Sequence, residues 1–157
     1  MDKNDFEQQY LALLPGLYRL AKSILYSHAD AEDAVQSAAL KALKAMNRLR
    51  PGNEKAYIVR IVINECHNIQ RRRKRELPVD TFPEEEGTGG GEAAELRIAL
   101  NALNEKYRTA LLLRYMEGYS EKETAQILEL SLPALKSRLH RARKALANEL
   151  GQEVDFE

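Results

Sequence analysis

Apolar residues recur at three- and four-residue steps along most of the chain, and this spacing predicts helices. One stripe lies within SHADAEDAVQSAALKALKAMNRL and consists of Val35, Ala38, Ala39, Ala42, Leu43 and Met46. A second stripe follows and consists of Ile58, Ile61, Val62 and Ile69. An earlier helix is predicted over about residues 6–26, bent or restarted near Pro15-Gly16.

Polar residues and helix breakers mark the ends of these helices. Asp30 and Asp33 suit the first turn of the helix that carries Val35, where carboxylates cap free N–H groups and favour the helix dipole. Pro51-Gly52 is predicted to end that helix, and Asn53 can cap the next one. Because no segment alternates apolar and polar residues as a strand does, the fold class is predicted to be all-α.

The last third of the chain has the pattern of a helix-turn-helix. Helices are predicted over about residues 94–103 and 105–117, the second of them ended by Gly118. Ser120 and Glu123 have the spacing of a capping box for a short helix that runs to about Leu128. A tight turn at residues 129–131 follows. Ser131 then caps a final helix that tolerates Pro133 in its first turn. The inward stripe of that helix is predicted to be Leu135, Leu139, Ala142, Leu146 and Leu150.

Residues 76–95, ELPVDTFPEEEGTGGGEAAE, contain two prolines, four glycines and a Glu triplet. This composition is typical of a flexible linker between domains. The prediction is therefore two small helical domains, residues 1–75 and 96–150, joined by a flexible acidic linker and followed by an acidic tail at 151–157.

The formal net charge of zero conceals two basic blocks. Residues 1–75 carry a net +6 and residues 96–150 a net +4, whereas the linker carries −7 and the tail −3. A basic block is the usual electrostatic footprint of a nucleic-acid-binding protein.

The outer side of the final helix is basic and polar. In a helix-turn-helix the second helix enters the major groove, where Arg and Lys suit guanine O6/N7 and also grip phosphates. A solvated amphipathic helix is the alternative interpretation, but the capping box, the turn and the clustered positive charge favour DNA binding. The residues on this side are Lys136, Ser137, Arg138, His140, Arg141, Arg143 and Lys144.

Five consecutive cations, Arg71, Arg72, Arg73, Lys74 and Arg75, end the first predicted domain. Cations suit a helix C-terminus, so a solvated helix end is one interpretation. Five in a row exceed what capping requires, which favours phosphate contact and salt-dependent binding.

No arrangement of residues indicates an enzyme, a metal site or a cofactor. Asp30, Glu32 and Asp33 are explained by capping, and their exposed side, which Gln36 shares, suits either protein docking or solvation. The single cysteine, Cys66, is expected to pack between helices. The polar start of the chain is unlike a signal peptide and no apolar run could cross a bilayer, so a cytoplasmic protein without membrane insertion is expected.

The segments LLLRYMEGYSEKETAQIL and LKSRLHRARKAL closely resemble region 4 of extracytoplasmic-function (ECF) sigma factors of the sigma-70 family. DAEDAVQSAALKAL and AYIVRIVINECHNIQRRRKR resemble region 2 of the same family, more loosely. The resemblance covers nearly the whole chain and implies an RNA polymerase sigma factor that initiates transcription without catalysing a reaction itself.

The resemblance assigns region 2 to the core polymerase and the −10 element. Docking on the clamp helices of the β′ subunit would use Asp30, Glu32, Asp33 and Gln36. Melting and capturing the −10 element as a single strand would use Arg48, Asn53, Tyr57, Arg60, Asn64, Arg71, Arg72 and Arg73.

The resemblance assigns region 4 to the −35 element as duplex and to the β flap of the polymerase. The base-facing positions would be Lys136, Ser137, His140 and Arg141, and the phosphate contacts Arg138 and Arg143. An anti-sigma factor that masks both domains is a further partner in the family. Two rival hypotheses are a stand-alone helix-turn-helix regulator that acts as a dimer on a palindromic site, and an adaptor that binds only proteins.

Overall fold

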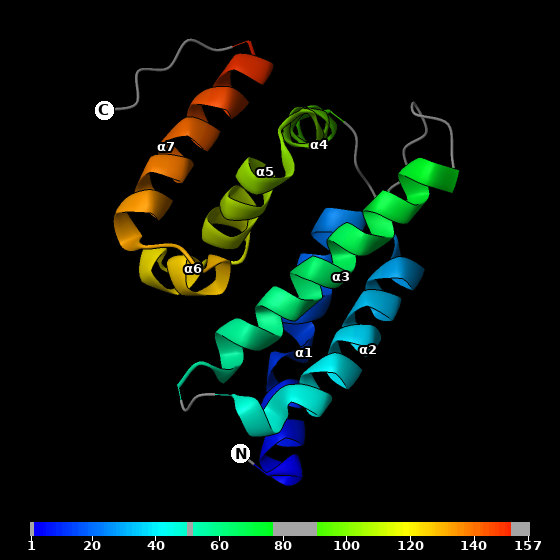
Figure 1. Cartoon of the computed structure of the whole chain (residues 1–157). Helices are drawn as coiled ribbons and strands as arrows, with labels where there is room; N and C mark the ends of the chain where they lie inside the picture. The colour runs from blue at the N-terminus through cyan, green and yellow to red at the C-terminus, as the bar shows by residue number, and fades with distance from the viewer. Residues whose placement is uncertain (1, 50–51, 77–90, 152–157) are drawn as a thin grey trace. The chain divides into compact units, whose positions relative to one another are not determined.

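The computed structural model describes residues 2–49, 52–76 and 91–151, and every regular element within those ranges is a helix (Figure 1). The predicted all-α class is confirmed. The chain divides into two compact units, one formed by the helices before residue 77 and one by the helices after residue 90.

The first unit is a bundle of α1 (Lys3–Leu25), α2 (His28–Ala45) and α3 (Glu54–Glu76), in which each helix packs against the other two (Figure 1). The fully buried large side chains come from α1 and α3, and they are Leu17, Leu20, Ile24, Leu25, Ile58, Val59 and Val62. At its fully buried positions α2 has alanines instead, namely Ala31, Ala34, Ala38 and Ala42. Because the distance between packed helices depends on the side chains at the contact, these alanines allow α2 to lie close to its neighbours.

Two predicted helix boundaries in this unit are wrong, namely a restart of the first helix near Pro15-Gly16 and the end of the second helix at Pro51-Gly52. α1 continues through Pro15 as one helix; Pro15 is exposed, so its ring lies on the solvent side. α2 ends at Ala45, and a short 3₁₀ helix η1 (Met46–Arg48) follows it before the predicted stop at Pro51-Gly52, of which Pro51 lies outside the described residues.

The N-terminus of α2 agrees with the prediction in part. The cap is the Ser27 hydroxyl, which accepts the Asp30 backbone N–H at 3.3 Å, and Asp30 lies in the first turn. The stripe on α3 is buried as predicted, whereas on α2 only Val35, Ala38 and Ala42 of the predicted stripe are buried. The buried face of α2 is rotated toward its alanines, which leaves Leu43 partly exposed.

The second unit contains α4 (Glu92–Ala102), α5 (Glu105–Leu111), α6 (Glu121–Leu128) and α7 (Leu132–Glu149). α7 packs against the three other helices, and the buried core includes Leu113, Ile127, Leu135 and Leu139 (Figure 1). α6, the turn and α7 form the predicted helix-turn-helix.

The local signals that predicted this motif are confirmed. The Ser120 hydroxyl accepts the Glu123 N–H and the Glu123 carboxylate accepts the Ser120 N–H, both at 3.0 Å. Glu129 occupies the left-handed region with φ of 58°, which ends α6. Ser131 caps α7, and Pro133 lies in its first turn.

Three boundaries in the second half differ from the prediction. α3 reaches Glu76 and α4 begins at Glu92, so both ends of the predicted linker are helical, and residues 77–90 lie outside the described part of the chain. The helix predicted over 105–117 is α-helical only to Leu111. It continues as a π-helical segment η2 (Leu112–Met116), in which the Glu117 N–H bonds the Leu112 carbonyl at 2.9 Å.

Candidate nucleic-acid interface

The recognition helix α7 has one buried face and one polar face. Leu135, Leu139 and Ala142 are at most 1% exposed and fix the orientation of the helix, whereas Leu146 and Leu150 of the predicted stripe are partly exposed. Opposite the buried face, the side chains at i, i+4 and i+7 are exposed, and they are Ser137, Arg141 and Lys144.

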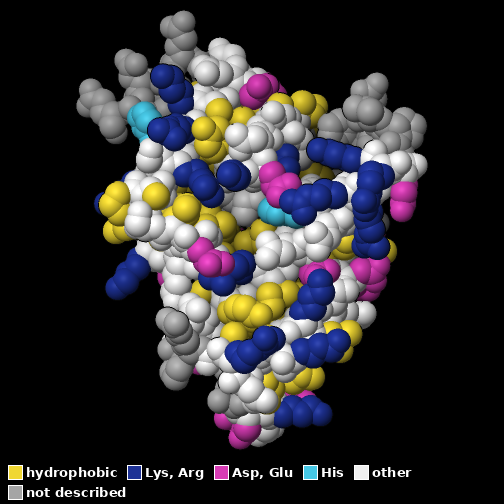
Figure 2. All heavy atoms as spheres, in the orientation of Figure 1, with side chains coloured by type: hydrophobic (Ala, Val, Ile, Leu, Met, Phe, Trp, Pro, Cys, Tyr) yellow, Lys and Arg dark blue, Asp and Glu magenta, His cyan; other side chains and the backbone are white. Residues whose placement is uncertain are grey.

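The remaining predicted residues of α7 flank this exposed row. Lys136 is exposed, and Arg138, His140 and Arg143 are partly exposed. All six residues predicted to contact the −35 element therefore lie outside the buried stripe of one capped helix. On the face that Figure 2 shows, Lys and Arg side chains are interspersed with apolar side chains.

Arg143 is held by a residue that the sequence did not single out. Its Nη1 donates to the Tyr115 hydroxyl at 2.7 Å, and the guanidinium carbon of Arg114 lies 5.6 Å from the centre of the Tyr115 ring. Tyr115 is 55% exposed, so this cluster lies at the surface of the second unit. No short-range sequence signal links Tyr115 to Arg143.

Four of the residues predicted to contact the −10 element share one face of α3. Tyr57, Asn64 and Arg71 are seven residues apart, which is nearly two full turns, and Arg60 lies between them at i+3. Asn64 and Arg71 are exposed, whereas Tyr57 and Arg60 are partly exposed. We refer to these four residues as the α3 polar row.

Asn68 extends the α3 polar row, although the prediction did not include it. It is exposed, lies four residues after Asn64, and accepts a hydrogen bond from Arg71 Nη1 at 3.2 Å. The i+4 spacing from Asn64 is the signal that could have identified it. Asn68 thereby restrains one of the cations at the end of the helix.

The two remaining predicted residues precede α3 in the chain. Arg48 closes η1 and is exposed. Asn53 directly precedes α3, and its backbone carbonyl accepts the Tyr57 N–H at 3.0 Å. Asn53 is therefore next to the first residue of the α3 polar row.

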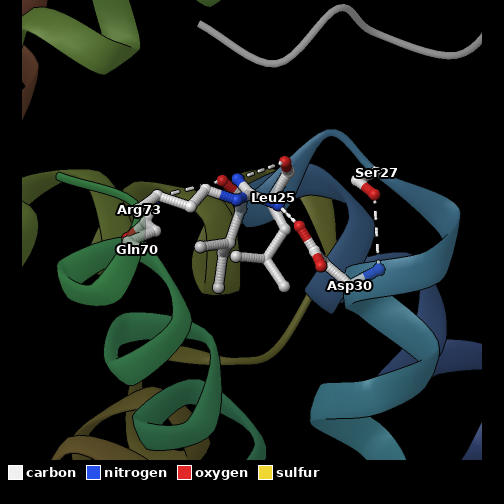
Figure 3. Close-up of polar contacts among 6 residues, drawn as sticks. Leu25, Ser27, Asp30, Gln70 and Arg73 are labelled. Atoms are coloured by element: carbon white, nitrogen blue, oxygen red, sulfur yellow. Dashed lines mark hydrogen bonds and ion pairs between the residues drawn. The ribbon is translucent and has the colours of Figure 1, made fainter. Parts of the chain in front are cut away.

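The five-cation run at the end of α3 does not form one exposed cluster. Arg71, Arg72, Lys74 and Arg75 are exposed. Arg73 is about 200° around the helix from Arg71 because two residues advance an α-helix by that angle. Its side chain is only 19% exposed, and it forms an ion pair with Asp30 and donates from Nη1 to the Leu25 carbonyl at 3.1 Å (Figure 3). Burial lowers the pKa of the Arg73 guanidinium.

The residues predicted to dock on the polymerase likewise include exposed side chains and one side chain that pairs within the bundle. Glu32, Asp33 and Gln36 are exposed on α2, whereas the Asp30 carboxylate is turned toward Arg73 (Figure 3). Leu40, which is 63% exposed and lies four residues after Gln36, continues this outer face. Leu40 is not among the predicted docking residues, although its i+4 spacing from Gln36 and its place outside the apolar stripe could have identified it.

The part of the chain that the structure describes holds no group of three His, Cys, Asp or Glu side chains able to bind a metal ion. Cys66 is fully buried, as expected for a packing residue, and burial together with the nearby Glu65 charge raises the pKa of its thiol to about 12. None of the described helices is long and apolar enough to span a membrane.

Comparison with protein families identifies both units. Residues 9–76 match the sigma-70 region 2 family, and residues 93–146 match the sigma-70 region 4 family. The chain is 34% identical to the ECF RNA polymerase sigma factor SigM of Mycobacterium tuberculosis, over 96% of this chain and 79% of SigM. It is 28% identical to the ECF RNA polymerase sigma factor SigE of Mycolicibacterium smegmatis, and there the match spans 87% of this chain but only 58% of the length of SigE.

Two solved structures have the same fold. The sigma factor RpoE of Bartonella quintana, in complex with the anti-sigma factor NepR, has a TM-score of 0.71 and 32% identity, over 96% of this chain and 99% of RpoE. CnrH, in complex with the cytosolic domain of CnrY, has a TM-score of 0.70 and 26% identity, over 96% of this chain and 90% of CnrH. The two family matches together with the identity to SigM show that this chain belongs to the ECF RNA polymerase sigma factors of the sigma-70 family.

Proposed function

We propose that this sigma factor directs core RNA polymerase to promoters through three separate surfaces. α7 reads the −35 element, the α3 polar row captures the −10 element, and the outer face of α2 docks on the polymerase. The observation that carries the proposal is the exposed row of Ser137, Arg141 and Lys144 on a capped helix whose opposite face is buried.

The −35 element is read as duplex by the first turns of α7. In a helix-turn-helix, residues near the start of the second helix approach the base edges of the major groove. Lys136 and Arg141 are suited to guanine O6 and N7, and Ser137 and His140 lie between them. Arg138 and Arg143, on the two flanks of the exposed row, contact phosphates and set the register of the helix.

The −10 element is captured as a single strand along α3. Extruding a base from the duplex costs on the order of a few kcal/mol, so the extruded base needs contacts that offset this cost. Tyr57 supplies a ring for stacking, and Asn64 and Arg60 supply hydrogen-bonding groups on the same face. Arg48 and Asn53 flank the entry to this row. Arg71 and Arg72 hold the backbone at its other end.

The chain acts in the cytoplasm as a recognition subunit, and catalysis stays with the polymerase. Glu32, Asp33 and Gln36 form the docking face for the β′ clamp helices, and the second unit contacts the β flap. RpoE, which shares 32% identity with this chain, was solved in complex with the anti-sigma factor NepR. By analogy, an anti-sigma factor that masks the same faces controls this chain.

The proposal is tested by transcription with purified core polymerase on a mixed genomic template, with and without this protein, followed by mapping of the RNA 5′ ends. We expect discrete new start sites that share upstream elements one promoter spacing apart. Arg141→Ala should weaken them, whereas Lys106→Ala, which removes an exposed cation from α5, should not. The absence of new starts, together with binding of the protein alone to a symmetric duplex, would instead identify a stand-alone regulator.

A further inference from the structure

Arg73 lies at a junction of all three helices of the first unit (Figure 3). It extends from α3 to the corner where α1 ends and α2 begins. There it donates to the Leu25 carbonyl at 3.1 Å and forms an ion pair with the Asp30 carboxylate. One turn earlier on α3, Gln70 Nε2 donates to the Ile24 carbonyl at 3.1 Å.

The electrostatics of this corner favour a cation. The last carbonyls of a helix lack intrahelical partners and form the negative end of its dipole, so the end of α1 attracts a positive donor. Asp30 in the first turn of α2 adds a full negative charge beside it. The planar guanidinium of Arg73 contacts the two groups with two different nitrogens in a fixed fork, whereas a lysine would have to reach both from one nitrogen.

The same corner determines where the docking face of α2 points. Glu32, Asp33 and Gln36 follow Asp30 within two turns of the same helix, and all three are exposed. Fixing the start of α2 against α1 and α3 therefore fixes the direction of these three side chains. Arg73 itself contributes little to the exposed basic surface because its side chain is 19% exposed.

We propose that Arg73 is a positioning residue for polymerase docking and that it does not contact promoter phosphates. It holds the corner between α1 and α2 so that the docking face is preorganised before the polymerase binds. This inference rests on the proposed function because it assumes that the α2 face binds the core enzyme. It assigns Arg73 a role different from that of Arg72, its exposed neighbour in the five-cation run.

The test measures the affinity of the full-length chain for purified core polymerase in the absence of DNA, by anisotropy of a fluorescent label. Arg73→Gln should weaken core binding about tenfold because the docking side chains must then be ordered on binding. The matched variant Lys74→Gln removes the exposed cation on the other side of Arg73 and should leave core binding unchanged, because Lys74 is not part of the corner between α1 and α2. Equal core affinity of Arg73→Gln and the wild type would overturn the inference.

A second variant keeps the test decisive if Arg73→Gln does not fold, as judged from its helical circular dichroism. Lys binds phosphate as a point charge but cannot replace the two-nitrogen contact, so Arg73→Lys should still weaken core binding several-fold. A phosphate role predicts no change in core binding for Arg73→Lys, and that result would overturn the inference.

The pairing with Asp30 is tested by a double-mutant cycle. Asp30→Asn should weaken core binding, and adding Arg73→Gln should cost little more because both changes remove the same interaction. Fully multiplicative losses would show that the two residues act independently and would contradict the positioning role. Failure of the wild-type chain to bind core polymerase at all would contradict the proposed function itself, and so the two failures are distinguishable.

Discussion

Arg143 on α7 donates a hydrogen bond to the hydroxyl of Tyr115 at 2.7 Å, across 28 residues of sequence. Tyr115 belongs to η2, whose π-helical turn precedes α6, so this contact ties the recognition helix to the segment that leads into the helix-turn-helix. The hydroxyl accepts one of the N–H groups of the guanidinium and so restrains its direction at the surface of α7. Tyr115 therefore holds Arg143 in one orientation before DNA binds.

Removing that hydroxyl should weaken duplex binding without removing any cation. In Tyr115→Phe the ring remains beside Arg114, but Arg143 loses the hydrogen bond to the hydroxyl and is held less tightly in its orientation. Immobilising such a side chain on binding costs about 0.5–1.5 kcal/mol, which corresponds to a loss of affinity between about two- and tenfold. The measurement is the affinity of the holoenzyme for a duplex bearing the −35 element. An unchanged or increased affinity would show that Tyr115 does not preorganise Arg143.

The capping box of α6 should contribute measurably to the stability of the helix-turn-helix. Ser120→Ala leaves the Glu123 N–H without its acceptor and should lower the free energy of unfolding by about 1 kcal/mol. Ser137→Ala is the matched control because Ser137 is exposed in the second turn of α7 and caps no helix. Urea unfolding followed by circular dichroism checks both variants. Equal midpoints for the two variants would contradict a capping contribution.

The parts of the fold that could be predicted from the sequence are those fixed by neighbouring residues. The capping box at Ser120, the Ser131 cap and the buried row from Leu135 to Ala142 each depend on residues within a few turns of one helix. The cap of α2 belongs to the same class but was missed. Ser27-x-x-Asp30 has the spacing of a cap, although the acidic residues that follow it are also typical of a first helical turn.

The parts that could not be predicted depend on contacts between distant segments. Arg73 was grouped with its neighbours because five adjacent cations look alike in sequence, and only the packing of α3 shows which one turns inward. The contact between Arg143 and Tyr115 also joins residues that are far apart in the sequence. The π-helical turn at Leu112–Met116 inserts one extra residue into a helix, and the apolar spacing alone does not reveal it.

Tyr57 should matter to promoter opening through its ring. Stacking of a base on an aromatic side chain is worth about 1–3 kcal/mol by alanine substitution, so Tyr57→Ala should reduce the affinity of the holoenzyme for single-stranded −10 DNA by at least about fivefold. Tyr57→Phe keeps the ring and should bind nearly as the wild type does. Oligonucleotide binding measured by anisotropy distinguishes the two variants. Equal losses in both would indicate a role for the hydroxyl in place of stacking.

Two buried groups should make the first unit sensitive to high pH. Burial raises the pKa of Tyr10, whose hydroxyl donates to the Val35 carbonyl at 2.5 Å, to about 12. The Cys66 thiol, buried near Glu65, likewise has a pKa of about 12, compared with 9.0 for an ordinary cysteine. In the unfolded chain both groups lose their protons at a lower pH than in the folded chain. Unfolding therefore releases protons at any pH between the unfolded and the folded pKa of each group.

Stability should therefore be independent of these two groups below about pH 9 and should fall as the pH rises from 9 toward 12. Each group lowers the free energy of unfolding by at most about 1.4 kcal/mol per pH unit within its window. Cys66→Ala and Tyr10→Phe should each flatten this slope, although both variants lose some stability at neutral pH through lost packing or a lost hydrogen bond.

Urea midpoints measured at intervals from pH 7 to 11 give the slopes directly, and a thiol reagent should modify Cys66 only as the chain unfolds. Variants with the wild-type slope, or a thiol that reacts in the folded chain at pH 8, would show that these groups titrate with ordinary pKa values and do not contribute to the alkaline loss of stability.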